Sequence, residues 1–133
     1  MDDILVPVSP GELIDKLTIL RIKSENIHDP AKLANVHREM EQLTRVADAA
    51  LPSSDELSQL WQDLYDVNCD LWQVEDDIRT FEQRRDFGAG FIGLARSVYI
   101  TNDRRAELKK RINMLLGSRL VEEKSYTDHG RGE

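Results

Sequence analysis

Apolar residues recur along most of this chain at the three- and four-residue steps of an α-helix. The clearest run extends over more than three heptads without a break: Leu57, Leu60, Leu64, Val67, Leu71, Val74, Ile78 and Phe81. A helix in a globular protein shows this spacing on the face that it buries. The pattern therefore predicts one long central helix at about residues 55–85, on which the other segments pack.

Two further helices are predicted before this one. Residues 9–12, Ser-Pro-Gly-Glu, combine a capping serine, a proline suited to the first helical position and the acid of a capping box, and apolar residues continue to about Ile27. Asp29-Pro30 begins the second helix, whose apolar positions run from Leu33 to Ala50. Because the connection is short, the two helices are expected to form an antiparallel hairpin.

The sequence after the long helix allows two interpretations. Residues 86–90 form a turn, with two glycines suited to ending a helix. Apolar residues then continue from Phe91 to Leu116. Residues 101–103, Thr-Asn-Asp, could cap a new helix there, but we favour one continuous helix because no Gly or Pro intervenes at that point.

The remaining segments lie at the two ends of the chain. Residues 2–8 are suited to an extended arm, and Leu120-Val121 could pair with it as a short β-ribbon. Residues 128–133 are expected to be disordered. The patterns together predict one all-α domain over residues 1–127, an antiparallel bundle of four to five helices.

Composition and charge narrow the classes of function. The 133 residues are 40% hydrophobic and 32% charged, with a net charge of −7, which argues against a general nucleic-acid or anionic-membrane binder. The charge is uneven: residues 1–103 carry 10 basic and 20 acidic groups, whereas residues 104–133 carry 8 and 5. We expect the basic segment 104–111 to face the acidic part of its own domain or of a second copy.

Several kinds of site are not predicted. Cys69 is the single cysteine, so no intramolecular disulfide and no cysteine-rich zinc site is expected. Glu25 and His28 match one half of a bundle di-metal site, and no second half is present. We therefore expect no metal and no cofactor. Without a signal peptide or membrane-spanning run, a cytoplasmic protein is expected.

The long helix carries a second stripe of residues beside its apolar positions: Trp61, Tyr65, Asn68, Trp72, Glu75, Arg79 and Glu82. Glu75 and Glu82 project close to the apolar positions, and Arg79 lies one turn from each. Because a buried carboxylate needs a partner, the favoured interpretation is a structural ion network. The alternatives are a pocket for a polar ligand and a protein interface with aromatic anchors.

The C-terminal helical region presents a matching polar face that could meet this stripe. The candidate ligand-binding residues are Asn68, Trp72, Glu75, Arg79, Tyr99, Asn102 and Asp103. Such a cluster resembles a site for an anionic or sugar-like ligand. It equally resembles a salt-bridge lattice between helices, which is commoner because charge networks are often purely structural.

The start of the first helix is a second candidate site. Gly11 lets another group approach the backbone, where free amides attract an anion. Glu12 and Lys16 lie beside it, and residues 122–124 of the chain's own tail, Glu-Glu-Lys, are the expected occupant. We hypothesise that the tail docks on the amino end of this helix.

Three stretches, at residues 10–20, 67–76 and 98–106 with 117–126, resemble a family of small bacterial proteins known only as a domain of unknown function. The resemblance spans almost the whole chain and implies a compact helical bacterial protein, but it brings no activity. In helix layout alone the chain is similar to helical chorismate mutases, which bind a dicarboxylate between long helices. The match to their basic residues is lacking, so this remains an analogy.

We therefore favour a non-enzymatic binding or assembly module, either a homodimer or a partner of another protein. The competing hypothesis is a small-molecule site between the long helix and the C-terminal helix, using Asn68, Glu75, Arg79, Asn102 and Asp103.

Overall fold

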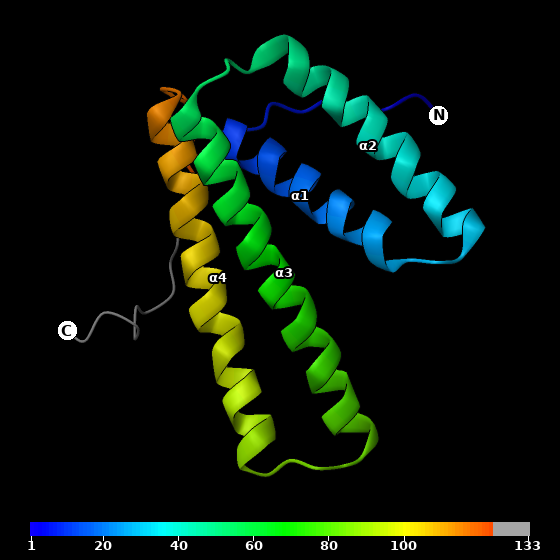
Figure 1. The fold of residues 1–133 in the computed structure, drawn as a ribbon. Helices are drawn as coiled ribbons and strands as arrows, with labels where there is room; N and C mark the ends of the chain where they lie inside the picture. Colours follow the sequence, from blue (N-terminus) through cyan, green and yellow to red (C-terminus); the bar gives the residue numbers. More distant parts are fainter. Residues whose placement is uncertain (124–133) are drawn as a thin grey trace, which may run out of the picture.

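The computed structural model describes residues 1–123, and these residues form four α-helices (Figure 1). The helices are α1 (Pro10–Asn26), α2 (Pro30–Ala50), α3 (Asp55–Gln83) and α4 (Ala89–Leu115). The predicted all-α class is confirmed. The alternative of five helices is wrong for this part of the chain, because α4 continues through residues 101–103 and Thr101 is buried within it.

Side-chain caps explain where the first three helices begin. Ser9 Oγ accepts a hydrogen bond from the amide of Glu12 at 3.1 Å, and Ser54 Oγ accepts one from the amide of Leu57 at 3.1 Å. Asp29 caps α2 in the same way, through the amide of Lys32. Each cap satisfies an amide that has no partner inside the helix, which stabilises the helix by about 1 kcal/mol.

The turn between α3 and α4 does not use its glycines as the sequence suggests. Arg85, with a φ of 53°, takes the left-handed position that ends α3. The amide of Asp86 then bonds to the carbonyl of Phe81 at 3.0 Å, which closes the last turn of the helix. Gly88 instead precedes the first residue of α4.

The helices are arranged as two hairpins, α1 with α2 and α3 with α4, which meet near the start of α1 and then diverge (Figure 1). Helix α1 packs against each of the other three helices. The prediction that the long helix is central is therefore wrong: α3 is the longest helix, but α1 is the central one. The reason is that α1 is buried on several sides, as its buried residues show: Gly11, Leu13, Ile14, Asp15, Leu17, Thr18, Leu20 and Ile22.

The apolar core lies on both sides of α1. One cluster joins α1 to α3 and α4, and contains Ile14, Leu57, Leu64, Val67, Leu108 and Ile112. A second, smaller cluster joins α1 to α2 through Leu13, Leu17 and Ala47. Trp61 of α3 packs against both clusters, so it ties the two hairpins together.

The α3/α4 hairpin extends well past this core (Figure 1). Leu57, Leu64 and Val67 are buried, but the later apolar positions of α3, from Leu71 to Phe81, are only half-buried. No residue between 69 and 100, all within the described chain, is fully buried. We call residues 69–100 the arm, a pair of helices that pack mainly against each other.

The two ends of the described chain do not form the predicted ribbon, since no residue from 1 to 123 is in a strand. Residues 1–8 are extended and exposed, and Asp3 accepts a hydrogen bond from Gln42 of α2 at 2.8 Å. After α4, Ser118 forms a tight turn with Leu120, which directs the chain toward Lys109 instead. The predicted disordered tail, residues 128–133, lies outside the described residues.

Candidate functional site

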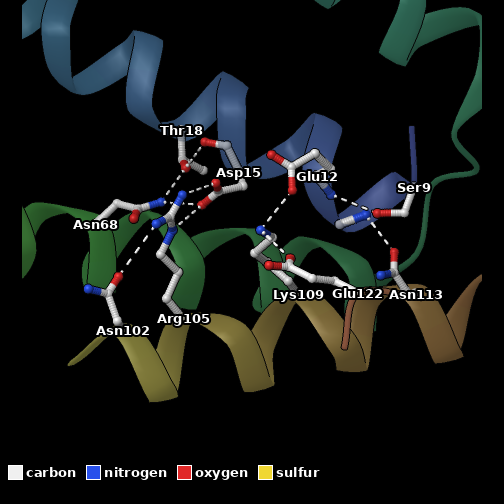
Figure 2. A network of polar contacts seen from close by, with 11 residues as sticks. Ser9, Glu12, Asp15, Thr18, Asn68, Asn102, Arg105, Lys109, Asn113 and Glu122 are labelled. Carbon is white, nitrogen blue, oxygen red and sulfur yellow. Dashed lines mark hydrogen bonds and ion pairs between the residues drawn. The ribbon is translucent and has the colours of Figure 1, made fainter. Parts of the chain in front are cut away.

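A network of polar side chains crosses the interface of α1, α3 and α4 (Figure 2). Asp15 of α1 is only 1% exposed, and Arg105 of α4 donates to both of its carboxylate oxygens, Nε to Oδ1 at 2.8 Å and Nη2 to Oδ2. Asn68 of α3 donates to the same Oδ1 at 2.9 Å and to Thr18 Oγ1 at 2.8 Å. Three helices therefore share one buried carboxylate.

The chemistry of this carboxylate explains the choice of partners. A buried charge is costly unless it is paired and hydrogen-bonded. The planar guanidinium of Arg105 matches the two oxygens of Asp15 in a bidentate pair. The hydrogen bond to Asp15 raises the pKa of Arg105, and burial only partly opposes this effect. Arg105 therefore keeps its positive charge beside the carboxylate of Asp15.

A second part of the network lies about one turn nearer the start of α1 (Figure 2). Lys109 Nζ contacts Glu12 at 2.8 Å and Glu122 at 2.9 Å, and its side chain is nearly buried. Burial disfavours the charged form of Lys109, but the two carboxylates outweigh burial and raise its pKa. Lys109 thus connects the first turn of α1 to the segment that follows α4.

Close packing of α1 on α4 brings the backbone itself into the network. The amide of Gly11 donates to Asn113 Oδ1 at 2.8 Å. A β-carbon on Gly11 would lie 2.5 Å from the carbonyl oxygen of Lys109. Only glycine therefore fits this crossing without moving one helix away from the other.

The buried polar side chains of the network find their hydrogen-bond partners within the protein. Among the described residues, no buried side-chain nitrogen or oxygen lacks a hydrogen-bond partner. No group of three or more His, Cys, Asp or Glu residues in positions 1–123 could hold a metal ion. The chemical effect of the arrangement is to fix the register of three helices.

The structure divides the predicted ligand-binding residues into two groups. Asn68 lies inside the network, and Asn102 lies at its edge, with Oδ1 3.5 Å from Arg105 Nη1. The other members lie on the arm or beside it, namely Trp72, Glu75, Arg79, Tyr99 and Asp103. Asn68 and Arg105 thus share the carboxylate of Asp15, and Asn102 contacts Arg105, a residue predicted only as part of the basic segment 104–111.

The prediction that the ion network around Glu75 is buried is wrong. Glu75 and Arg79 are 3.8 Å apart, and their side chains are 47% and 72% exposed. The reason is that α1 has already left α3 at this level, so only α4 packs against the arm. Among residues 1–123, the buried carboxylate is that of Asp15 instead.

The second candidate site, around Gly11 and Glu12, lies at the start of α1, but the amides of these two residues already have hydrogen-bond partners within the protein. The amide of Gly11 bonds to Asn113, and the amide of Glu12 bonds to Ser9. Lys16 is exposed. Glu122 of the tail reaches Lys109, which also holds Glu12, and Lys124 lies outside the described residues.

The sequence contained a signal for the residues that were missed. Asp15 and Thr18 occur among the apolar positions of α1, and Arg105 falls on the same spacing as Val98, Leu108 and other apolar positions of α4. A charge at an apolar position of one helix predicts an opposite charge at such a position of another. Asp15 and Arg105 satisfy this rule.

Tyr65 extends the contacts of α3 with α1 outside the core. Its hydroxyl donates to Glu25 Oε1 at 2.6 Å, and the guanidinium of Arg21 lies 3.9 Å from the centre of its ring. The hydrogen bond to Glu25 and the neighbouring Cys69 raise the pKa of Tyr65. The stripe of Tyr65 and Asn68 is therefore the side of α3 that α1 covers.

None of the helices in residues 1–123 is long and apolar enough to cross a membrane. No curated protein and no solved structure gives a significant match to the chain. A family model does match, over residues 4–130, and it is described as a family of unknown function. The chain therefore belongs to the family of unknown function DUF6165, which confirms the resemblance found in its sequence.

Proposed function

We propose that this protein is a non-enzymatic binding module whose arm docks on another protein chain. The observation that carries the proposal is the exposure of large apolar side chains on the arm. Phe87 and Ile92 are 51% and 55% exposed, and Tyr99 and Ile100 are 41% and 46% exposed. Apolar side chains gathered on one projecting element are typical of a protein interface.

The interior of the protein supports the same proposal. The most unusual charged residues, Asp15 and Arg105, bind each other, and Asn68 completes their hydrogen bonds. Groups that are committed to one another in this way stabilise the fold rather than take part in a reaction. The arm, by contrast, is supported mainly by the packing of its own two helices, so its exposed surface can bind a partner.

Site-specific photo-crosslinking tests the proposal. A benzophenone amino acid replaces Ile92 on the arm, and in a matched control it replaces Val46, which is similarly exposed on α2. On irradiation in cells that express the protein, we expect covalent adducts with a protein from position 92 and none from position 46. Absence of adducts at position 92, or equal labelling at both positions, would contradict the proposal.

A small-molecule site beside the arm is the competing proposal. It is favoured by the guanidinium of Arg105, whose side chain is 28% exposed and has the exposed Asn102 at its edge. Glu75 and Arg79 lie further along the arm. A thermal-shift screen with carboxylates and sugars tests this proposal. A compound that raises the melting temperature of the wild type, but not of Asn102→Ala, would favour it over protein docking.

A further inference from the structure

The arm is uncovered on one particular side. Near its base, α1 covers the side of the hairpin that carries Tyr65 and Asn68 on α3 and Lys109 on α4. Steps of three, four and seven residues continue these two stripes along the arm, to Trp72, Glu75 and Arg79 on α3 and to Asn102, Tyr99 and Ile92 on α4. The surface that accepts a helix at the base thus continues, without that helix, along the arm.

We infer that this surface, the inner face of the arm, binds a second copy of the chain around a two-fold axis. The inference rests on the proposed function, in which the arm is the docking element, and it names the partner. In this dimer the two arms lie side by side and antiparallel. Each arm contributes two helices, so that four helices pack together.

The charges on the inner face are self-complementary in this arrangement. Glu75 and Arg79 lie one turn apart on α3 and 3.8 Å from each other, and their side chains are 47% and 72% exposed. When two identical helices run antiparallel about an axis midway between these positions, each Glu75 faces the other copy's Arg79. A two-fold interface needs a surface that complements itself. One acid and one base at this spacing form two equivalent ion pairs across the axis, one on each side of it.

The length of the arm fits the same axis. Opposite positions on the two copies of α3 then have residue numbers that add to 154, so Trp72 near the base of one arm faces Glu82 near the tip of the other. The arms overlap along the part of α3 that belongs to them, residues 69–83, which is about 22 Å of helix. The other copy's α1 and α2 come beyond the tip, next to Phe87, which is exposed and packs edge-on against Phe91.

Apolar side chains would supply most of the free energy of association. Trp72, Tyr99 and Ile92 project from the inner face, and Tyr99 and Ile92 are exposed. Aromatic residues at the centre of an interface contribute more to binding than charged residues at its edge. The Glu75–Arg79 pairs set the register and direction of the two arms.

Sedimentation velocity over a range of protein concentrations tests the inference. We expect a monomer–dimer equilibrium for the wild type, and a dimer weakened roughly tenfold or more by Arg79→Glu or by Glu75→Arg, because each change places like charges opposite each other. The double variant with both changes exchanges the charges on both copies and is expected to restore the dimer.

A matched control is available on α2, where Arg45 and Glu41 form an exposed pair of the same spacing. Arg45→Glu is expected to leave the equilibrium unchanged. A wild type that stays monomeric, or a dimer that Arg79→Glu leaves intact, would overturn the inference. If residue 92 then still forms adducts with a different protein, the proposed function stands and only the identity of the partner is wrong.

Discussion

At the scale of single residues, the stability of the fold depends on the pair formed by Asp15 and Arg105. Arg105→Ala removes the only cation that bonds to Asp15 among the described residues, and leaves a carboxylate that is 1% exposed. Loss of one partner of a buried pair costs about 3–5 kcal/mol. We expect the free energy of unfolding in urea to fall by that amount.

Two controls separate the pair from a general effect of charge. Arg104 is the exposed neighbour of Arg105, and Arg79 is 72% exposed on the arm. Arg104→Ala and Arg79→Ala should each change the free energy of unfolding by less than about 0.5 kcal/mol. If the three variants unfolded alike, the assignment of Asp15 as the buried charge would be wrong.

Lys109 gives the fold a pH dependence in the alkaline range. Its pKa in the folded state is raised above the ordinary value of 10.5. Its charge therefore stabilises the fold fully below pH 10.5, and this contribution is lost as the pH rises through the folded-state pKa. Lys109→Met should cost about 2 kcal/mol at pH 7, since it removes hydrogen bonds to two carboxylates.

Urea unfolding of the wild type and of Lys109→Met at several pH values tests this prediction. The difference in free energy between the two proteins should be constant from about pH 6 to pH 9 and should shrink above pH 10.5. A difference that grows with pH would show that burial of Lys109, and not its pairing with Glu12 and Glu122, determines its pKa.

The environment of single residues could be predicted only where it follows from the residue spacing along one helix. The apolar run of α3 followed from its spacing, and its residues Leu57, Leu64 and Val67 are buried. Asp15 and Arg105 are 90 positions apart, so their contact depends on how α1 crosses α4. Glu75 was expected near the interior because the spacing places it beside apolar positions; spacing cannot show that α1 ends its contact with α3 before this level.

At the scale of elements, the helices follow the sequence closely, because caps and prolines are local signals. The predicted start of α1 at residues 9–12 is confirmed by the bond from the Glu12 amide to Ser9. The central helix was not predictable in this way. Length and regular spacing pointed to α3, whereas the close approach that makes α1 central depends on Gly11.

Gly11 and Gly93 provide a matched test of how α1 sits on α4. Gly11→Ala places a β-carbon 2.5 Å from the Lys109 carbonyl oxygen, whereas a β-carbon on Gly93 meets no atom within 4 Å. We expect Gly11→Ala to destabilise the protein by about 1–3 kcal/mol, the usual cost of overpacking. Gly93→Ala should stabilise it by up to about 1 kcal/mol, because alanine favours a helix.

Thermal unfolding monitored by circular dichroism at 222 nm tests both glycine variants, since the protein is helical throughout its core. The two substitutions add the same methyl group to a helix, so opposite signs are the expected result. If both raised the melting temperature, α1 could move away from α4 without cost, and the close crossing at Gly11 would not be required by the fold.

At the scale of the whole molecule, the chain returns to the place where its first helix begins. The turn at Ser118 directs the following residues to Lys109, and Lys109 holds Glu122 beside Glu12. The hypothesis that the tail docks on the amino end of α1 therefore takes a specific form. The tail reaches α1 through the charge of Lys109, because the amides of Gly11 and Glu12 already have partners.

Glu122→Gln and Glu123→Gln test this link, since they remove the same charge at adjacent positions. Of these two tail residues, Glu122 is the one that contacts Lys109. Its side chain is 59% exposed, so solvent screening limits the effect to about 0.5–1 kcal/mol. For a chain of 133 residues this lowers the melting temperature by about 2–4 °C. Glu123→Gln should leave it unchanged.

Deletion of residues 120–133 should lower the melting temperature at least as much as Glu122→Gln, because it removes the same carboxylate. Amide hydrogen exchange should then speed up in the first turns of α1, where Glu12 keeps Lys109 as its partner but Lys109 has lost Glu122. If the deletion left both the melting temperature and the exchange of α1 unchanged, the tail would contribute nothing to the start of α1, and the contact of Glu122 with Lys109 would be energetically neutral.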